Sequence, residues 1–194
     1  MMVPASRVTG GTGALPAAGA LLAMDAAGAS CSGAIWADGR VAVRRFSAMA
    51  RGQSERLVPM IAEAMAEWGG GFADLDALAV TTGPGGFTGV RIGLATARGL
   101  ALARGLPLIG VSSFEVAAAA VPAGTRSGRR VLAALESKRA ALFIQLFDDD
   151  LNALGDPAEI APADLAAELA GVLPAGPLLV AGDAAERAVA ALAA

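Results

Sequence analysis

The chain has 194 residues, of which 55% are hydrophobic and 17% charged, and its formal net charge is -3. This composition is typical of a folded core and excludes a disordered chain, while the negative charge excludes strong, unaided attraction to nucleic acid. The sequence contains no histidine, which excludes Ser-His-Asp and Cys-His catalysis from this chain alone, and every zinc site with a histidine ligand.

The segment before the first predicted strand is rich in Ala, Gly, Pro and Thr, and we interpret residues 1–19 as a disordered extension or as the product of an upstream start codon. A secretion signal is the weaker alternative, because Pro16 and Gly19 interrupt its apolar run and Asp25 ends that run. No apolar stretch reaches the ~20 residues needed to span a bilayer, so no membrane association is predicted. The single cysteine, Cys31, leaves no internal disulfide and fits the cytoplasm, where we expect the protein.

An antiparallel meander is predicted at the start of the folded chain. Its strands span Ala20–Ala26, Ser30–Ala37 and Arg40–Ala48. Asp38-Gly39 is a strong two-residue hairpin signal between the second and third strands.

Two helices are predicted next, around a short buried strand. The first spans Ser54–Trp68, with Ser54 as its N-cap, because a serine oxygen can accept a hydrogen bond from the first amides of a helix. The strand spans Leu78–Thr82, and a glycine-rich turn then leads into a helix over Thr88–Arg104. Gly105 is expected to end that helix.

The remaining predicted elements are strand 107–111, helix 113–121, strands 130–135 and 141–147, helix 161–170, strand 178–181 and helix 184–193. We place a lobe boundary in the loop Pro122–Gly128, which divides the chain into a first lobe, 20–122, and a smaller second lobe, 123–194. The alternation of strands and helices indicates parallel pairing in a mixed sheet with helices on both faces. This order of elements is that of actin-like and ribonuclease-H-like α/β folds.

The stretch Thr82–Gly93 (TGPGGFTGVRIG) is the most distinctive in the chain. Its glycines free the backbone, and the amides at the start of the following helix could bind an anion through Gly85, Gly86 and Thr88, the last of which can also cap the helix. The stretch lacks the lysine of a phosphate-binding Walker loop and the spacing of a dinucleotide fingerprint, so a purely structural turn is an equal alternative.

Small residues form two ridges on the second helix. The first is Gly89, Gly93, Ala97 and Ala101, and the second is Ala95, Gly99 and Ala103. Such ridges allow close approach of a helix or sheet, so either both pack against the protein's own sheet or one faces a partner. On the first helix, Met60 is expected on the polar face, where methionine is an adaptable partner anchor, among Arg56, Glu63 and Glu67.

No side chain forms a convincing catalytic or metal site. Asp25 ends the first strand, where an acidic residue of an actin-like fold can organise metal and phosphate. We interpret it as a turn acid, because no second carboxylate can be paired with it from the sequence. Cys31 lies in an apolar strand and is interpreted as a core residue. Glu136, with Lys138 and Arg139, is interpreted as part of a charged hairpin between two strands.

Several segments together resemble the TsaB (YeaZ) family: AMDAAGASCSGAIW, GQSERLVPMI and DLDALAVTTGPGGFTGVRIGLATARGLALARGLPLIGVSSFE. The later ALESKRAALFIQLFD and VAGDAAERA resemble the family's second lobe more weakly. The resemblance runs from Leu21 to the end and implies an actin-like, two-lobed fold of the sugar-kinase and heat-shock-protein superfamily. Gln53 departs from the His often found there, and family members usually extend further, which makes a truncated second lobe an expectation.

The resemblance implies a non-catalytic subunit without a cofactor or metal of its own, which pairs with TsaD as a heterodimer. TsaD holds the metal and transfers the threonylcarbamoyl group to the adenosine beside the tRNA anticodon. TsaE, an ATPase, joins the pair, so ATP and metal are expected on partner subunits and tRNA is contacted through the complex. Whether the isolated protein forms a homodimer is not determined by the sequence. The pairing surface implied by the first two helices comprises Leu57, Met60, Ile61, Ala64, Gly89, Gly93, Ala97 and Ala101.

Two other functions compete with this interpretation. One is a stand-alone actin-like phosphotransferase that uses ATP, which an ATP hydrolysis assay of the purified protein would reveal. The other is a metallopeptidase, since the family has also been labelled a glycoprotease. The absence of histidine removes the expected zinc ligands and argues against peptidase activity.

Overall fold

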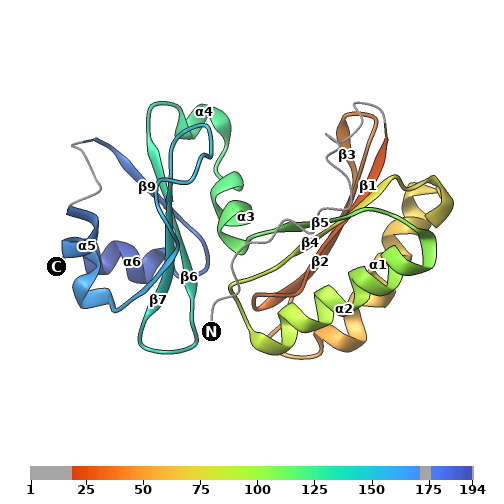
Figure 1. Cartoon of the computed structure of the whole chain (residues 1–194), viewed down its shortest axis with the longest axis horizontal. Coiled ribbons are helices and arrows are strands. Elements are labelled where there is room, and N and C mark those ends of the chain that lie inside the picture. Colours follow the sequence, from red (N-terminus) through yellow and green to blue (C-terminus); the bar gives the residue numbers. More distant parts are fainter. Residues whose placement is uncertain (1–18, 171–175, 194) are drawn as a thin grey trace. The chain divides into compact units, whose positions relative to one another are not determined.

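The computed structural model describes residues 19–170 and 176–193, so the predicted extension lies outside the described residues except for Gly19. The chain forms two compact units that divide between Ser112 and Ser113. Each unit consists of a mixed β-sheet with helices packed against it (Figure 1). None of the helices among the described residues is long and apolar enough to cross a membrane.

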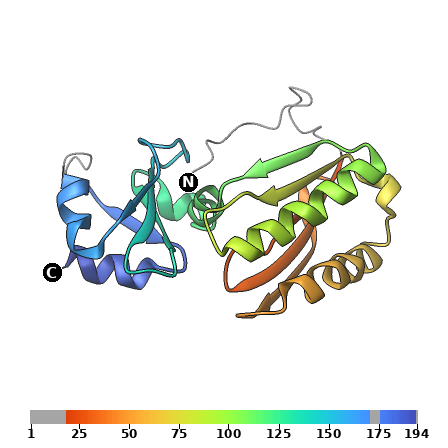
Figure 2. The same cartoon turned by 60° about the horizontal axis from the view of Figure 1, so that its bottom comes forward.

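The first unit follows the predicted order of elements closely. Its sheet has the strand order β3-β2-β1-β4-β5, in which β1, β2 and β3 are antiparallel neighbours and β1, β4 and β5 pair in parallel. The helices α1 and α2 lie side by side over one face of this sheet (Figures 1 and 2). The elements are β1 (Ala20–Asp25), β2 (Ser30–Ala37), β3 (Arg40–Ala48), α1 (Gln53–Trp68), η1 (Phe72–Asp74), β4 (Ala77–Thr81), α2 (Phe87–Arg104) and β5 (Leu108–Val111).

A single core fills the space between this sheet and its two helices. Alternate strand residues such as Leu22, Ile35 and Leu78 point into it, as the period of two in a strand requires. Leu57 on α1 and Ala97 on α2 meet them from the helical layer, and all five side chains have no solvent exposure. Both helices therefore bury one face against the same side of the sheet.

Glycines, rather than side-chain caps, begin the two helices. Gly52 precedes α1 with a φ of 93°, and its carbonyl accepts hydrogen bonds from the amides of Glu55 and Arg56, both at 3.1 Å. Ser54 lies inside the first turn, so the predicted N-cap is wrong. Gly86 precedes α2 without a side-chain cap, so the predicted cap at Thr88 is also wrong.

The helix ends agree with prediction. Gly69 and Gly105 follow α1 and α2 with φ angles of 80° and 65°, in the left-handed region that glycine tolerates best. The amide of Gly69 donates a hydrogen bond to the carbonyl of Met65, and the amide of Gly105 donates one to the carbonyl of Ala101. Both glycines are therefore the helix stops that the sequence predicts.

The second unit has the strand order β8-β7-β6-β9, with β6 and β9 parallel and the other pairs antiparallel. Its helices cover both faces: α5 and α6 pack in one apolar cluster and α3 in another. In the first unit, by contrast, both long helices share one face. The elements are α3 (Ser113–Ala119), α4 (Ala123–Arg126), β6 (Arg130–Glu136), β7 (Leu142–Phe147), β8 (Ala158–Ile160), η2 (Pro162–Asp164), α5 (Leu165–Ala170), β9 (Leu178–Ala181) and α6 (Ala185–Leu192).

The units divide ten residues before the predicted lobe boundary at 122/123. The reason is the helix α3, whose buried residues Phe114 and Ala118 pack with Val131 and Phe147 of the second sheet. The predicted boundary loop itself contains the short helix α4, and the strand β8 was not predicted. Both are too short to carry a periodic signal in the sequence.

Candidate functional site

The glycine-rich turn before α2 packs closely against the loop that joins β1 and β2. A Cβ atom on Gly89 would lie 1.9 Å from the carbonyl oxygen of Ala26, and one on Gly85 would lie 2.5 Å from that of Ala27. The amide of Gly86 donates a hydrogen bond of 2.7 Å to the same Ala27 carbonyl. Side chains at Gly85 and Gly89 would force this backbone contact apart.

This packing bears on the predicted anion site. The Gly86 amide already has a protein acceptor, which favours the structural alternative for that residue. Gly85 and Thr88 are exposed at the surface. Anion binding by these two residues stays a prediction.

Asp25 holds the end of β1 in place. Its Oδ1 accepts a hydrogen bond of 2.8 Å from the Ala27 amide and another from the hydroxyl of the buried Thr81 at the end of β4. The contact with Ala27 is that of a turn acid, as interpreted from the sequence, and the contact with Thr81 ties the ends of β1 and β4 together. Within residues 19–170 and 176–193, no group of three or more Cys, Asp or Glu side chains is placed to hold a metal ion.

The predicted interface residues of α1 lie in the protein's own core. Leu57, Met60 and Ala64 have no exposed surface, and Ile61 is 3% exposed. The expectation that Met60 lies on a polar, solvated face is wrong. Its position in α1 instead continues the buried stripe of Leu57, Ile61 and Ala64 at helical spacing, so it packs toward the sheet.

The first small-residue ridge of α2 is also directed inward. Gly89, Gly93 and Ala97 are buried, and Ala101 packs partly buried against the same core. A Cβ atom on Gly93 would lie 3.4 Å from a methyl group of Val80 on β4. For this ridge the structure selects the alternative in which small residues let the helix approach its own sheet. These four residues do not form an exposed surface.

The exposed faces of α1 and α2 are different residues. On α2, a stripe at helical spacing consists of Phe87, Arg91, Ala95, Arg98 and Leu102, and we call it the α2 stripe. Leu102 is 88% exposed and Phe87 69% exposed, so the stripe presents two large apolar side chains to solvent. On α1, the corresponding exposed residues are Glu55, Val58, Ala62 and Ala66.

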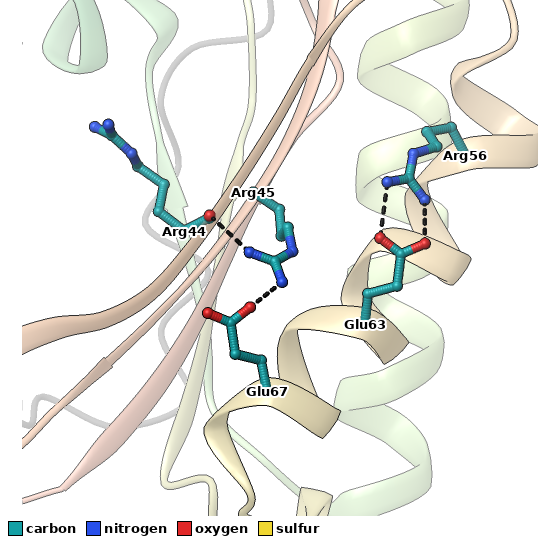
Figure 3. Close-up of polar contacts among 5 residues, drawn as sticks. All are labelled: Arg44, Arg45, Arg56, Glu63 and Glu67. Atoms are coloured by element: carbon teal, nitrogen blue, oxygen red, sulfur yellow. Dashed lines mark hydrogen bonds and ion pairs between the residues drawn. The ribbon is translucent and has the colours of Figure 1, made fainter.

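Charge differs between the two helices. The acidic side chains Glu63 and Glu67 of α1 pair with Arg56 and with Arg45 of β3 (Figure 3). The guanidinium of Arg56 donates two hydrogen bonds, of 2.6 and 2.8 Å, to the Glu63 carboxylate. These bonds hold the pKa of the Glu63 carboxyl below its usual value.

The helix α2 carries three arginines and no acidic residue. The guanidinium of Arg91 lies 3.6 Å from the centre of the Phe87 ring. Neither Arg91 nor Arg98 forms an ion pair with any residue that the structure describes. This basic stripe was not predicted, although arginines two turns apart on a helix without acidic residues would have indicated it.

Two further sequence interpretations agree with the structure. Cys31 is fully buried, and burial raises the pKa of its thiol above the usual value. Glu136 adjoins the β6–β7 hairpin, where Arg187 of α6 pairs with its carboxylate and donates a hydrogen bond of 2.8 Å to the Ala140 carbonyl. The charged hairpin is therefore anchored to α6, a contact that no local sequence pattern predicts.

Known proteins match most of this chain. Residues 47–190 match the family model of TsaD, tRNA N6-adenosine threonylcarbamoyltransferase. The tRNA threonylcarbamoyladenosine biosynthesis protein TsaB of Escherichia coli is 38% identical over 135 residues, which are 69% of this chain and 57% of that protein. The tRNA N6-adenosine threonylcarbamoyltransferase of Erythrobacter litoralis is 50% identical over 66 residues, 34% of this chain and 19% of that protein. The chain thus matches little more than half the length of its E. coli relative.

A solved structure agrees with these sequence matches. YeaZ from Pseudomonas aeruginosa has a TM-score of 0.71 and 25% sequence identity to this chain, and the match covers 90% of both chains. The expected actin-like α/β fold of two lobes is thereby confirmed. The chain belongs to the TsaB (YeaZ) family, within the wider family that the TsaD model describes.

Proposed function

We propose that this chain is a non-catalytic subunit that pairs with TsaD when threonylcarbamoyladenosine is formed beside the anticodon of tRNA. Membership of the TsaB family carries the proposal, and the exposed faces of α1 and α2 support it. In this proposal TsaD holds the metal and transfers the group, TsaE supplies ATPase activity, and tRNA is contacted through the complex in the cytoplasm.

The contacts around the glycine-rich turn support a subunit without its own phosphate chemistry. Asp25 Oδ1 and the Gly86 amide, which a phosphate or its metal could contact, are engaged within the protein, whereas Gly85 and Thr88 are exposed. These internal contacts leave fewer groups for a nucleotide than a stand-alone phosphotransferase would use. The same contacts suit a subunit whose first lobe has a structural role.

The exposed residues that support pairing differ from those expected from the sequence. Binding is favourable when a partner covers large apolar side chains that are exposed to water, because removing apolar surface from water lowers the free energy. Leu102 and Val58, 88% and 57% exposed on the neighbouring helices α2 and α1, meet this condition. Phe46 and Val41 on β3 meet it as well, and the resemblance to the TsaB family selects the two helices. We therefore assign the TsaD surface to the outward faces of the two helices, in place of the buried residues.

Calorimetry of the purified chain with TsaD from the same genome tests the proposal. We expect a one-to-one complex, and no ATP hydrolysis by the isolated chain. Leu102→Asp should weaken binding roughly ten-fold or more, because an unpaired charge would be buried at the interface. Val41→Asp is the matched control, since Val41 is exposed on β3. The absence of a complex, or robust ATP turnover by the isolated chain, would contradict the proposed function.

A further inference from the structure

The α2 stripe combines features that fit one kind of partner. Arg91 and Arg98 lie two turns apart on the exposed side of α2, with Ala95 between them and Leu102 one turn beyond. The two side chains therefore leave the helix on the same face. A partner that docks here meets two arginines, with the small Ala95 between them and the exposed apolar Leu102 at one end.

The arginines are available for pairing. Among the described residues neither has an acidic partner, whereas the acidic side chains Glu63 and Glu67 of the neighbouring α1 are paired. Arg91 is also held against the ring of Phe87, which limits the freedom that its guanidinium would lose on binding. An approaching carboxylate would meet a guanidinium that is already positioned.

We propose that the protein that docks on α2 places carboxylate side chains opposite Arg91 and Arg98 and covers Leu102 with an apolar surface. The inference rests on the proposed function and specifies the partner surface: a helix or strand of TsaD with acidic side chains. Complementary charge of this kind fixes the register of an interface and rejects partners without it.

A second copy of the chain fits this surface less well. The described parts of α1 and α2 offer Glu55 as their only acidic side chain outside an ion pair, against two arginines that need partners. RNA also fits less well, because neither phosphates nor bases require the exposed aliphatic Leu102, and the chain carries a net charge of -3.

The test is the affinity of full-length Arg91→Glu/Arg98→Glu for TsaD, measured by calorimetry at low and at physiological salt. We expect wild-type affinity to fall as salt rises, and the variant to bind roughly ten-fold or more weakly with little salt dependence. Arg40→Glu/Arg44→Glu on β3 makes the same change in net charge at exposed arginines away from α2 and should bind like wild type. Arg91→Gln/Arg98→Gln should lie between wild type and the charge-reversed variant.

The outcomes separate this inference from the function on which it rests. Equal TsaD affinity for wild type and Arg91→Glu/Arg98→Glu would overturn the inference alone. So would a variant that loses tRNA binding or self-association but keeps TsaD. A wild-type chain that forms no complex with TsaD would overturn the proposed function and the inference with it. Melting temperatures within a few degrees of wild type would show that the variants are folded.

Discussion

Small residues lie on both faces of α2, but their surroundings on the two faces are opposite. On the inner face, Gly89 lets the helix approach the Ala26 carbonyl so closely that a Cβ atom would lie 1.9 Å from it. On the outer face, a Cβ atom on Gly99 would meet no described atom within 4 Å. The same residue type therefore marks tight packing on one side of the helix and open surface on the other.

This difference shows why spacing alone did not identify the partner surface. Small residues at intervals of four predict that something can approach closely, without indicating whether it is the protein's own sheet. The charged residues on the same helix carry the missing information. Arg91 and Arg98 can be placed only toward solvent or a partner, so they identify the outer face.

The largest expected effect comes from a charge placed on the inner side of the helical layer. Met60 has no exposed surface, so Met60→Glu would bury an unpaired carboxylate and leave the core badly packed. We expect a loss of about 3 kcal/mol or more in the free energy of unfolding, measured by urea denaturation. Ala62→Glu, on the exposed side of α1, is the control and should leave stability nearly unchanged. A stable Met60→Glu protein would contradict the inward placement of Met60.

A smaller but still large effect is expected at the contact between α2 and the β1–β2 loop. Gly89→Ala should cost roughly 1–3 kcal/mol or more, because the new methyl group forces the helix away from the Ala26 carbonyl. Thermal unfolding followed by circular dichroism would measure the loss. An unchanged melting temperature would mean that the close approach is not maintained in solution.

The outer face should respond in the opposite direction. Gly99→Ala removes the flexibility of a helical glycine without a new contact, so it should stabilise the fold by roughly 0.5–1 kcal/mol. The same unfolding measurement, set beside that of Gly89→Ala, compares the two faces directly. Destabilisation by Gly99→Ala would indicate that this face is packed rather than open.

Most of the first unit could be predicted from the sequence because its signals are local. The hairpin at Asp38-Gly39 and the stops at Gly69 and Gly105 depend on neighbouring residues, and all three agree with prediction. The predicted caps at Ser54 and Thr88 were wrong, because Gly52 and Gly86 precede the two helices and neither helix has a side-chain cap. Local chemistry allows a serine cap but does not require one.

The candidate surface was harder to predict because it depends on contacts distant in sequence. Met60 lies three residues after Leu57 and four before Ala64, so its helical spacing does indicate the apolar face of α1, and the expected polar face overlooked that pattern. The packing of α3 against β6, which moves the unit boundary, is a tertiary contact. On α2, which has apolar residues on both sides, helical periodicity limits which residues share a face, and the placement of the sheet decides which face is inside.

The smallest expected effect concerns the ion pairs on the rim of α1, which lie apart from both faces of α2. Because Arg56 lowers the pKa of Glu63, the stabilisation from this pair is present above the unfolded-state pKa of glutamate. It should be lost as the pH falls through the lower pKa of the folded state. Glu63→Gln should therefore flatten the acid side of the stability profile slightly and leave stability near neutral pH almost unchanged, since the pair is exposed to solvent. Urea denaturation of wild type and variant between about pH 3 and pH 7 would measure this. An identical slope in the two proteins would show that the pair seen in Figure 3 contributes nothing to folding.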